Sequence, residues 1–140
     1  MLDRRGAFAA LVSAALLAAC HSPPAASPTR DFRAGFTQIG IASWYGAAFH
    51  KKRTANGERF DMYSLTAAHR TLPLNSYVRV TRLANGRSVV VRINDRGPYF
   101  ADRIIDLSAR AARDLGMEED GIAEVRIEVV NASEANFRWR

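Results

Sequence analysis

The stretch YVRVTRLANGRSVVVRIN, residues 77–94, contains two strand-forming runs around one tight turn. Residues 77–83 and 88–94 are rich in β-branched side chains, which pack well in strands. Asn85 and Gly86 lie between the runs, and Asn-Gly is the preferred pair for a type I′ turn because both central residues need a positive φ. The stretch therefore predicts a β-hairpin.

The rest of the chain supplies more strands and one helix. Residues 123–129 alternate apolar and charged side chains, the pattern of a strand with one buried face. Residues 40–45 and 64–68 resemble two further strands. A short helix is predicted to follow Ser108 as its N-cap and to end at Gly116. Five or six short strands with a single helix predict a mainly β protein, a small closed barrel.

Composition limits the classes of site that this chain can build. Its 140 residues favour one domain, and 48% hydrophobic with 24% charged residues allow a packed core. The 20 Lys and Arg against 14 Asp and Glu give a net charge of +6. One cysteine rules out an internal disulfide framework and a thiolate zinc cluster, and three histidines leave little for a metal site. We expect no metal and no cofactor.

The N-terminus is typical of a bacterial lipoprotein. Arg4 and Arg5 precede an apolar run over residues 6–19, which has the length of a signal peptide and is short for a membrane span. The run ends in LAAC, residues 17–20, which resembles a lipobox. We therefore expect cleavage before Cys20 and lipidation of this residue, the only cysteine of the chain.

Four segments are predicted along the chain: a signal peptide, a lipidated cysteine with a Pro/Ala/Ser-rich tether, a barrel domain and a polar tail, over residues 1–19, 20–36, 37–130 and 131–140. In the tail, Phe137 or Trp139 is expected to pack back on the domain. The anchor places the protein in the bacterial envelope. Because His21 rather than an aspartate follows the cysteine, the periplasmic face of the outer membrane is favoured over the inner membrane.

Three segments carry more polar and aromatic residues than a plain barrel needs. They are ASWYG, RTANGERFD followed by LTAAH, and VRINDRGPY, at residues 42–46, 53–69 and 91–99. In the third, an apolar strand ends in an acid, Asp95, followed by a turn that Gly97 and Pro98 fix. An acid held rigidly at the rim of a scaffold is a common arrangement for a functional group.

These segments resemble the RlpA (rare lipoprotein A) family of bacterial envelope proteins. The resemblance covers about residues 40–130 and rests on GIASWYG, TANGE, LTAAH, VRINDRGP and IIDLS. It implies a six-stranded double-psi β-barrel, related to expansins and barwin-like domains, with one or two short helices. It also implies an endolytic lytic transglycosylase that cleaves peptidoglycan between MurNAc and GlcNAc and leaves 1,6-anhydro ends. Many members carry a C-terminal SPOR domain, which is not expected in the tail here.

The resemblance assigns roles to individual residues. It implies that the catalytic groups are Asp95, Glu58 and His69. The leaving oxygen must gain a proton and the muramic 6-hydroxyl must lose one, so we expect Asp95 to act first as general acid and then as base. Glu58 and His69 would orient the sugar or tune the charge near it. The expected substrate-binding residues are Trp44, Tyr45, Asn94, Arg96, Thr54 and Asn56.

Each assignment has a structural alternative. Asp95 could cap its own turn, Glu58 could be a solvated hairpin residue, and His69 could be a buried histidine with satisfied hydrogen bonds. Trp44 and Tyr45 could be core aromatics instead of a sugar-stacking surface. These alternatives stay open at the level of the sequence.

The sequence also leaves an alternative open for the whole protein. Asp106, in the IIDLS motif, is expected to have an architectural role at the helix start or in an arginine pair. The expected partner is the peptidoglycan glycan strand, with the protein a monomer on the membrane. Nucleic acid is not expected, because the signal sequence leads out of the cytoplasm. The alternative function is a non-catalytic, expansin-like protein that binds peptidoglycan.

Overall fold

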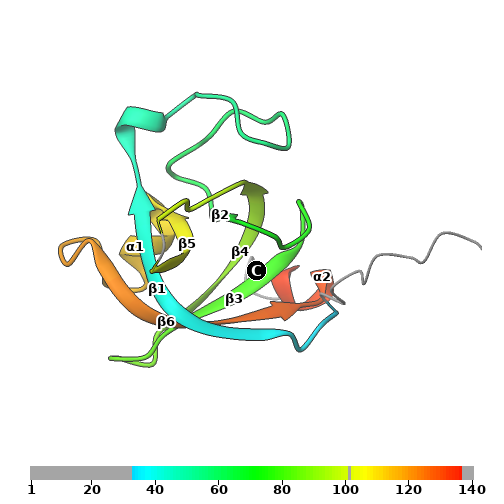
Figure 1. The fold of residues 1–140 in the computed structure, drawn as a ribbon, viewed down its shortest axis with the longest axis vertical. Coiled ribbons are helices and arrows are strands. Elements are labelled where there is room, and N and C mark those ends of the chain that lie inside the picture. The colour runs from blue at the N-terminus through cyan, green and yellow to red at the C-terminus, as the bar shows by residue number, and fades with distance from the viewer. Residues whose placement is uncertain (1–32, 101, 137–140) are drawn as a thin grey trace, which may run out of the picture.

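Six strands close into a barrel in the order β1-β5-β2-β4-β3-β6 (Figure 1). The structure is a computed structural model, which describes residues 33–100 and 102–136. The strands are β1 (Thr37–Tyr45), β2 (Thr66–His69), β3 (Tyr77–Arg82), β4 (Ser88–Asp95), β5 (Arg103–Ser108) and β6 (Ile122–Val130). Three short helices accompany them: η1 (Ala47–Phe49), α1 (Ala109–Asp114) and α2 (Ala132–Asn136).

The barrel mixes parallel and antiparallel pairs. β1 pairs with β5 and β2 with β4 in parallel, and the other four pairs are antiparallel. Because β2 lies between β4 and β5, the chain passes the end of β2 when it leaves β4 for β5. The closed, six-stranded mixed barrel confirms the predicted double-psi fold.

The sequence patterns located most of these elements. The predicted hairpin is β3 and β4, with Gly86 at φ 70° in its turn. Ser108 caps α1 by accepting a hydrogen bond from the Ala111 amide, as predicted, and Gly116 follows the helix with φ 70°. The prediction of secondary structure missed β5. Its outward-facing Ile104 packs on β1 at Gly40, where a Cβ would lie only 2.6 Å away, so β5 lacks a clear alternation of apolar and polar residues.

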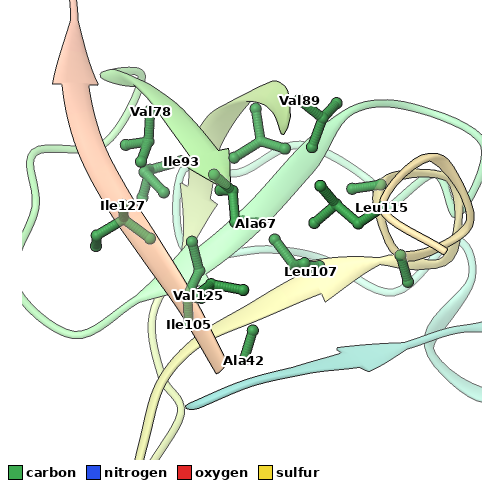
Figure 2. Packing of buried hydrophobic residues seen from close by; sticks show 14 of the residues in the cluster. Ala42, Ala67, Val78, Val89, Ile93, Ile105, Leu107, Leu115, Val125 and Ile127 are labelled. Carbon is green, nitrogen blue, oxygen red and sulfur yellow. The ribbon is translucent and has the colours of Figure 1, made fainter. Parts of the chain in front are cut away.

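The core fills the inside of the barrel with aliphatic side chains (Figure 2). Alternate residues of all six strands point inward, and residues within and just after α1 close one side. The fully buried members include Ala42, Ala67, Val78, Val80, Val91, Ile93, Ile105, Leu107, Leu115, Met117 and Val125. With these residues inside, the residues between them on each strand face outward and are available for a site.

Several predictions concern residues outside the described ranges. Cys20, the signal peptide and most of the tether lie there, as do Phe137 and Trp139. At the start of the expected tail the structure shows a helix, α2, whose Ala135 is buried. In the part of the chain that is described, no helix is long and apolar enough to cross a membrane.

The long connection between β1 and β2 extends over one end of the barrel (Figure 1). Within it, Arg53 and Arg59 pair as an isolated antiparallel bridge, so residues 53–59 form a small hairpin-like loop. This loop, called the 53–59 loop below, contacts the end of β4 through two backbone amides. The amides of Ala55 and Asn56 donate to the Asp95 carboxylate and to the Asn94 carbonyl. The predicted site therefore lies where the loop meets β4.

Candidate active site

One row of residues crosses four neighbouring strands on the outer face of the barrel. Ser43 aligns with Asp106, Asp106 with Ala68, and Ala68 with Asp95. Aligned residues point to the same face of a sheet, and the adjacent Ala67 is in the core, so the row faces outward. Two carboxylates thus flank the small Ala68 side chain, with their Cα atoms separated by two strand spacings, about 10 Å.

Asp95 ends β4 and has one oxygen engaged. Its Oδ1 accepts hydrogen bonds from the backbone amides of Ala55 at 3.0 Å and Arg96 at 2.8 Å. Within the described part of the chain, its Oδ2 makes no hydrogen bond. The carboxyl group thus caps its own turn and still presents one oxygen for proton transfer.

The Arg96 side chain does not pair with the carboxylate of Asp95. Its Nη1 donates to the carbonyl oxygens of His69 at 3.2 Å and Leu72 at 2.8 Å. Arg96 was expected to bind substrate. The structure shows it holding the turn that follows β2, so its guanidinium does not pair with Asp95.

Glu58 forms a bidentate ion pair with Arg92. The Oε1–Nη1 and Oε2–Nη2 distances are 2.7 and 2.8 Å. The hydrogen bond from Arg92, assisted by its charge and by Asn56 and Asn94, lowers the pKa of Glu58. Glu58 is therefore ionised at neutral pH, which makes it a fixed negative charge and a poor proton donor.

Three expected substrate contacts instead organise the 53–59 loop. The Thr54 hydroxyl donates to Asn56 Oδ1 at 2.6 Å, and the same oxygen accepts the Glu58 amide at 3.2 Å. Asn94 is buried beneath the loop with 1% exposure. These side chains hold Glu58 and Asp95 in place, and the loop brings both carboxylates to the end of β4.

Trp44 and Tyr45 are half-buried and packed against protein. Trp44 aligns with the core residue Leu107, and its Nε1 donates to the Glu118 carbonyl at 3.2 Å. The Tyr45 ring lies against Phe60, with 4.4 Å between ring centroids. This packing favours the core-aromatic interpretation over an exposed sugar-stacking surface.

The Tyr45 hydroxyl nevertheless reaches the site. It is buried and has no hydrogen-bond partner among the residues that the structure describes. Burial raises the pKa of Tyr45, and the negative charges of Asp95 and Asp106 raise it further. The hydroxyl is thus a neutral group within electrostatic reach of both carboxylates.

Asp106 is the residue of the site that sequence reasoning left out. Its Oδ1 accepts a short hydrogen bond from the Ser43 hydroxyl, and its Oδ2 lies 3.4 Å from Arg103 Nη2. The predicted arginine pair is therefore present. The row also places Asp106 across Ala68 from Asp95. Its occurrence in the IIDLS motif was the signal from which Asp106 could have been assigned to the candidate site.

His69 lies on the other face of β2. It aligns with the core residue Ile105 and is 4% exposed. Its Nδ1 accepts the amides of Thr71 and Leu72, both at 3.1 Å, and its Nε2 lies 3.3 Å from Gln38 Oε1. The imidazole was expected in the site. Its structure is that of a buried histidine with satisfied hydrogen bonds. Its backbone carbonyl accepts a hydrogen bond from the Arg96 side chain, and the Arg96 amide donates to Asp95.

The protonation of His69 gives a testable effect on stability. Burial, followed by the charges of Arg96 and Arg70, lowers the pKa of His69 from 6.5 to about 4. Between these values the unfolded chain binds a proton that the folded chain does not, so this contribution is complete above pH 6.5 and is lost as pH falls towards 4. The expected loss is roughly 3 kcal/mol over the window.

Urea unfolding at a series of pH values between 7.5 and 4 measures this effect. The free energy of unfolding of the wild type should fall more steeply with decreasing pH than that of His69→Gln, which has no titrating group at this position. Equal slopes for the two proteins would show that His69 titrates normally in the folded state.

No metal-binding cluster of three or more His, Cys, Asp or Glu side chains occurs in residues 33–100 and 102–136. The two carboxylates in the row are each engaged by protein hydrogen bonds, as described above. The Oδ2 oxygen of Asp95, which has no hydrogen-bond partner in the described residues, suits proton transfer, and the neighbouring carboxylates suit electrostatic stabilisation.

Comparison with known proteins matches both the sequence and the fold. The lytic transglycolase family profile matches residues 37–127. A Pseudomonas aeruginosa protein named endolytic peptidoglycan transglycosylase RlpA is 58% identical over 104 residues, which are 74% of this chain. The chain covers only 30% of the length of that relative.

Two solved structures share the architecture. A Streptomyces papain inhibitor aligns with a TM-score of 0.59 and 24% identity, over 72% of this chain and 100% of the inhibitor. An expansin from Clavibacter michiganensis, in complex with cellohexaose, aligns with a TM-score of 0.54 and 20% identity, over 69% of this chain and 51% of the expansin. At this level of identity the two likenesses show a common fold.

Proposed function

This chain belongs to the RlpA family of lytic transglycolases, and from that premise we propose that it cleaves peptidoglycan glycan strands without using water. The observation that carries the proposal is the position of Asp95. The residue ends a barrel strand, and one carboxyl oxygen is fixed by two backbone amides while the other has no partner in the described chain. Asp106 and the ionised Glu58 supply further negative charge nearby.

In the proposed reaction Asp95 acts twice. As a carboxylic acid it gives its proton to GlcNAc O4, the oxygen that links MurNAc C1 to GlcNAc C4, and the C1–O4 bond breaks. The resulting carboxylate then takes the proton of the MurNAc 6-hydroxyl as its oxygen bonds to C1. Atoms and charge balance without water, and the products are a 1,6-anhydro end and a free GlcNAc 4-hydroxyl.

The other groups of the site act on the charge that develops at C1. The transition state resembles an oxocarbenium ion, and fixed negative groups stabilise positive charge in a site of this kind. Glu58 is suited to that role because Arg92 keeps it ionised. Asp106 is held by Ser43 and Arg103 on the opposite side of Ala68. Arg96 and His69 act as positioning residues for the turn beside Asp95.

The test separates an enzyme from a protein that only binds glycan. Purified peptidoglycan sacculi are incubated with the chain carrying Cys20→Ser, and soluble glycan fragments are measured alongside the amount of protein that sediments with the sacculi. We expect both sedimentation and release of fragments. Sedimentation without any release would support the expansin-like alternative instead.

We further propose that the chain is a lipoprotein of the bacterial envelope. The proposal rests on the LAAC sequence and its single cysteine, which precede the barrel. Two or more acyl chains at Cys20 give stable membrane anchoring, whereas one gives only marginal binding. The anchored monomer works on glycan close to the membrane, and the outer membrane is the favoured location.

The anchor gives a direct prediction. Expressed in a Gram-negative host, the wild-type chain should fractionate with membranes and show the mass of a lipidated, cleaved product. Cys20→Ser should lose both properties, since its hydroxyl is not a substrate for lipidation. A wild-type protein without a lipid mass shift, and with the same membrane association as Cys20→Ser, would contradict the lipoprotein assignment.

A further inference from the structure

Two neighbouring aromatic side chains project from the connection between β4 and β5. Tyr99 is 82% exposed and Phe100 is 64% exposed. They follow Asp95 by four and five residues, in the segment that passes the end of β2. Exposed large apolar side chains that occur together mark an interaction surface more often than a structural need. The mechanism above makes no use of them.

The backbone below these rings is firmly held. Arg70, directly after β2, donates from Nε to the Pro98 carbonyl at 2.6 Å. Its Nη2 donates to the carbonyls of Phe100 and of Arg103, the latter at 2.8 Å. One side chain thus ties two points of the connection and the first residue of β5 to the end of β2. The two rings are presented on a fixed support, which lowers the entropic cost of binding.

Each ring lies against a residue that leads to one aspartate of the row. The Arg103 guanidinium lies 4.3 Å from the centroid of the Phe100 ring and 3.4 Å from the carboxylate of Asp106. On the other side, the Tyr99 ring lies beside Gly97, 3.7 Å from the position that a Cβ would occupy there. Gly97 is two residues from Asp95. Phe100 thus shares Arg103 with Asp106, and Tyr99 packs on the turn that follows Asp95.

We propose that Tyr99 and Phe100 form a platform on which a pyranose ring of the glycan strand stacks, next to the bond that is cleaved. This inference rests on the proposed function and assigns the stacking surface that Trp44 and Tyr45 do not provide. A pyranose has an apolar C–H face and a polar rim, which matches an aromatic surface with the Arg103 guanidinium beside it.

The chemistry around the platform favours a saccharide over a membrane. Asp102 is exposed in the same connection, which joins the strand that ends at Asp95 to the strand that carries Asp106. Insertion of the rings into a bilayer would bring these acids against anionic headgroups and towards a medium of low dielectric constant, which is unfavourable. A GlcNAc ring, which carries no charge, imposes no such cost.

The test measures binding without turnover. In the full chain carrying Asp95→Asn, affinity for chitohexaose and for purified glycan strands is measured by calorimetry and by sedimentation. Adding Tyr99→Leu with Phe100→Leu keeps apolar bulk and removes the aromatic faces, and should weaken both affinities by about 10-fold. Tyr99→Phe with Phe100→Tyr keeps two aromatic rings and should bind as the parent does.

Two exposed apolar side chains elsewhere on the molecule serve as matched controls. Tyr63→Ala and Leu83→Ala remove exposed apolar side chains elsewhere and should change affinity by less than twofold. In a chain that keeps Asp95, Tyr99→Leu with Phe100→Leu should raise KM far more than it lowers kcat. Unchanged glycan affinity in the leucine pair would overturn the platform, as would selective loss of binding to vesicles containing phosphatidylglycerol. Because the binding assay needs no cleavage, failure of the proposed reaction would be seen separately.

Discussion

Replacing Asp95 with asparagine is expected to lower the rate of glycan cleavage by about 10²- to 10⁴-fold, the usual contribution of a general acid–base group. The asparagine side-chain oxygen can still accept the amides of Ala55 and Arg96, which Asp95 binds through Oδ1. What it lacks is a transferable proton and a basic oxygen. The variant should therefore fold, bind sacculi and release almost no fragments.

The control is a neutral substitution of an exposed acid outside the row. Asp102→Asn removes one negative charge from the exposed connection between β4 and β5 and should keep activity within about threefold of the wild type, because surface charge acts weakly at a distance. Thermal unfolding of both variants checks the fold. Full activity in Asp95→Asn would refute the assignment and would move the acid to Asp106.

Replacing Glu58 with glutamine should lower activity on the order of 10²-fold, since it removes a fixed negative charge that is proposed to act on the charge at C1. Arg92 keeps one of its two hydrogen-bonding oxygens in this variant, so the 53–59 loop should persist. The pKa of Glu58 is held below its usual 4.5 by the hydrogen bond from Arg92. The carboxylate is therefore charged throughout pH 5–8, and the ratio of wild-type to variant activity should stay constant over that range.

A second ion pair provides the matched control for Glu58. Arg82 and Asp120 approach equally closely, at 2.7 Å, but at the other end of β3 and β4. Over the eight residues of β4 that end lies about 20 Å from Asp95. Asp120→Asn should leave cleavage unchanged. Equal losses in the two variants would mean that Glu58 acts through stability alone.

More of the barrel than of the candidate site could be predicted from the sequence. Local patterns located the β3–β4 hairpin, β6 and the cap of α1, because turn chemistry and alternation are properties of neighbouring residues. The motif resemblance supplied the topology, which local patterns do not encode. β5 escaped the patterns because Ile104 packs outward on Gly40 while Ile105 packs inward, so apolar residues follow one another.

The site depended on strand register, which a single sequence does not reveal. The parallel register between β2 and β4 shifts between Ala67 and Ala68, so that Ala68 aligns with Asp95 and not with Asn94. This shift brings Asp95 into the same row as Asp106. The same register turns the next residue, His69, towards the core. The motifs were enough to single out Asp95 and Glu58. The direction of the His69 side chain and the presence of Asp106 in the row could not be predicted.

The most direct test of the central claim is the chemistry of the new glycan ends. Sacculi are digested in water labelled with oxygen-18, and the fragments are analysed by mass spectrometry. The account predicts 1,6-anhydromuramic acid ends without label, because the 6-hydroxyl of the sugar replaces water. Reducing ends that carry the label would contradict it and would indicate hydrolysis, with Asp106 across the row as the base for an attacking water.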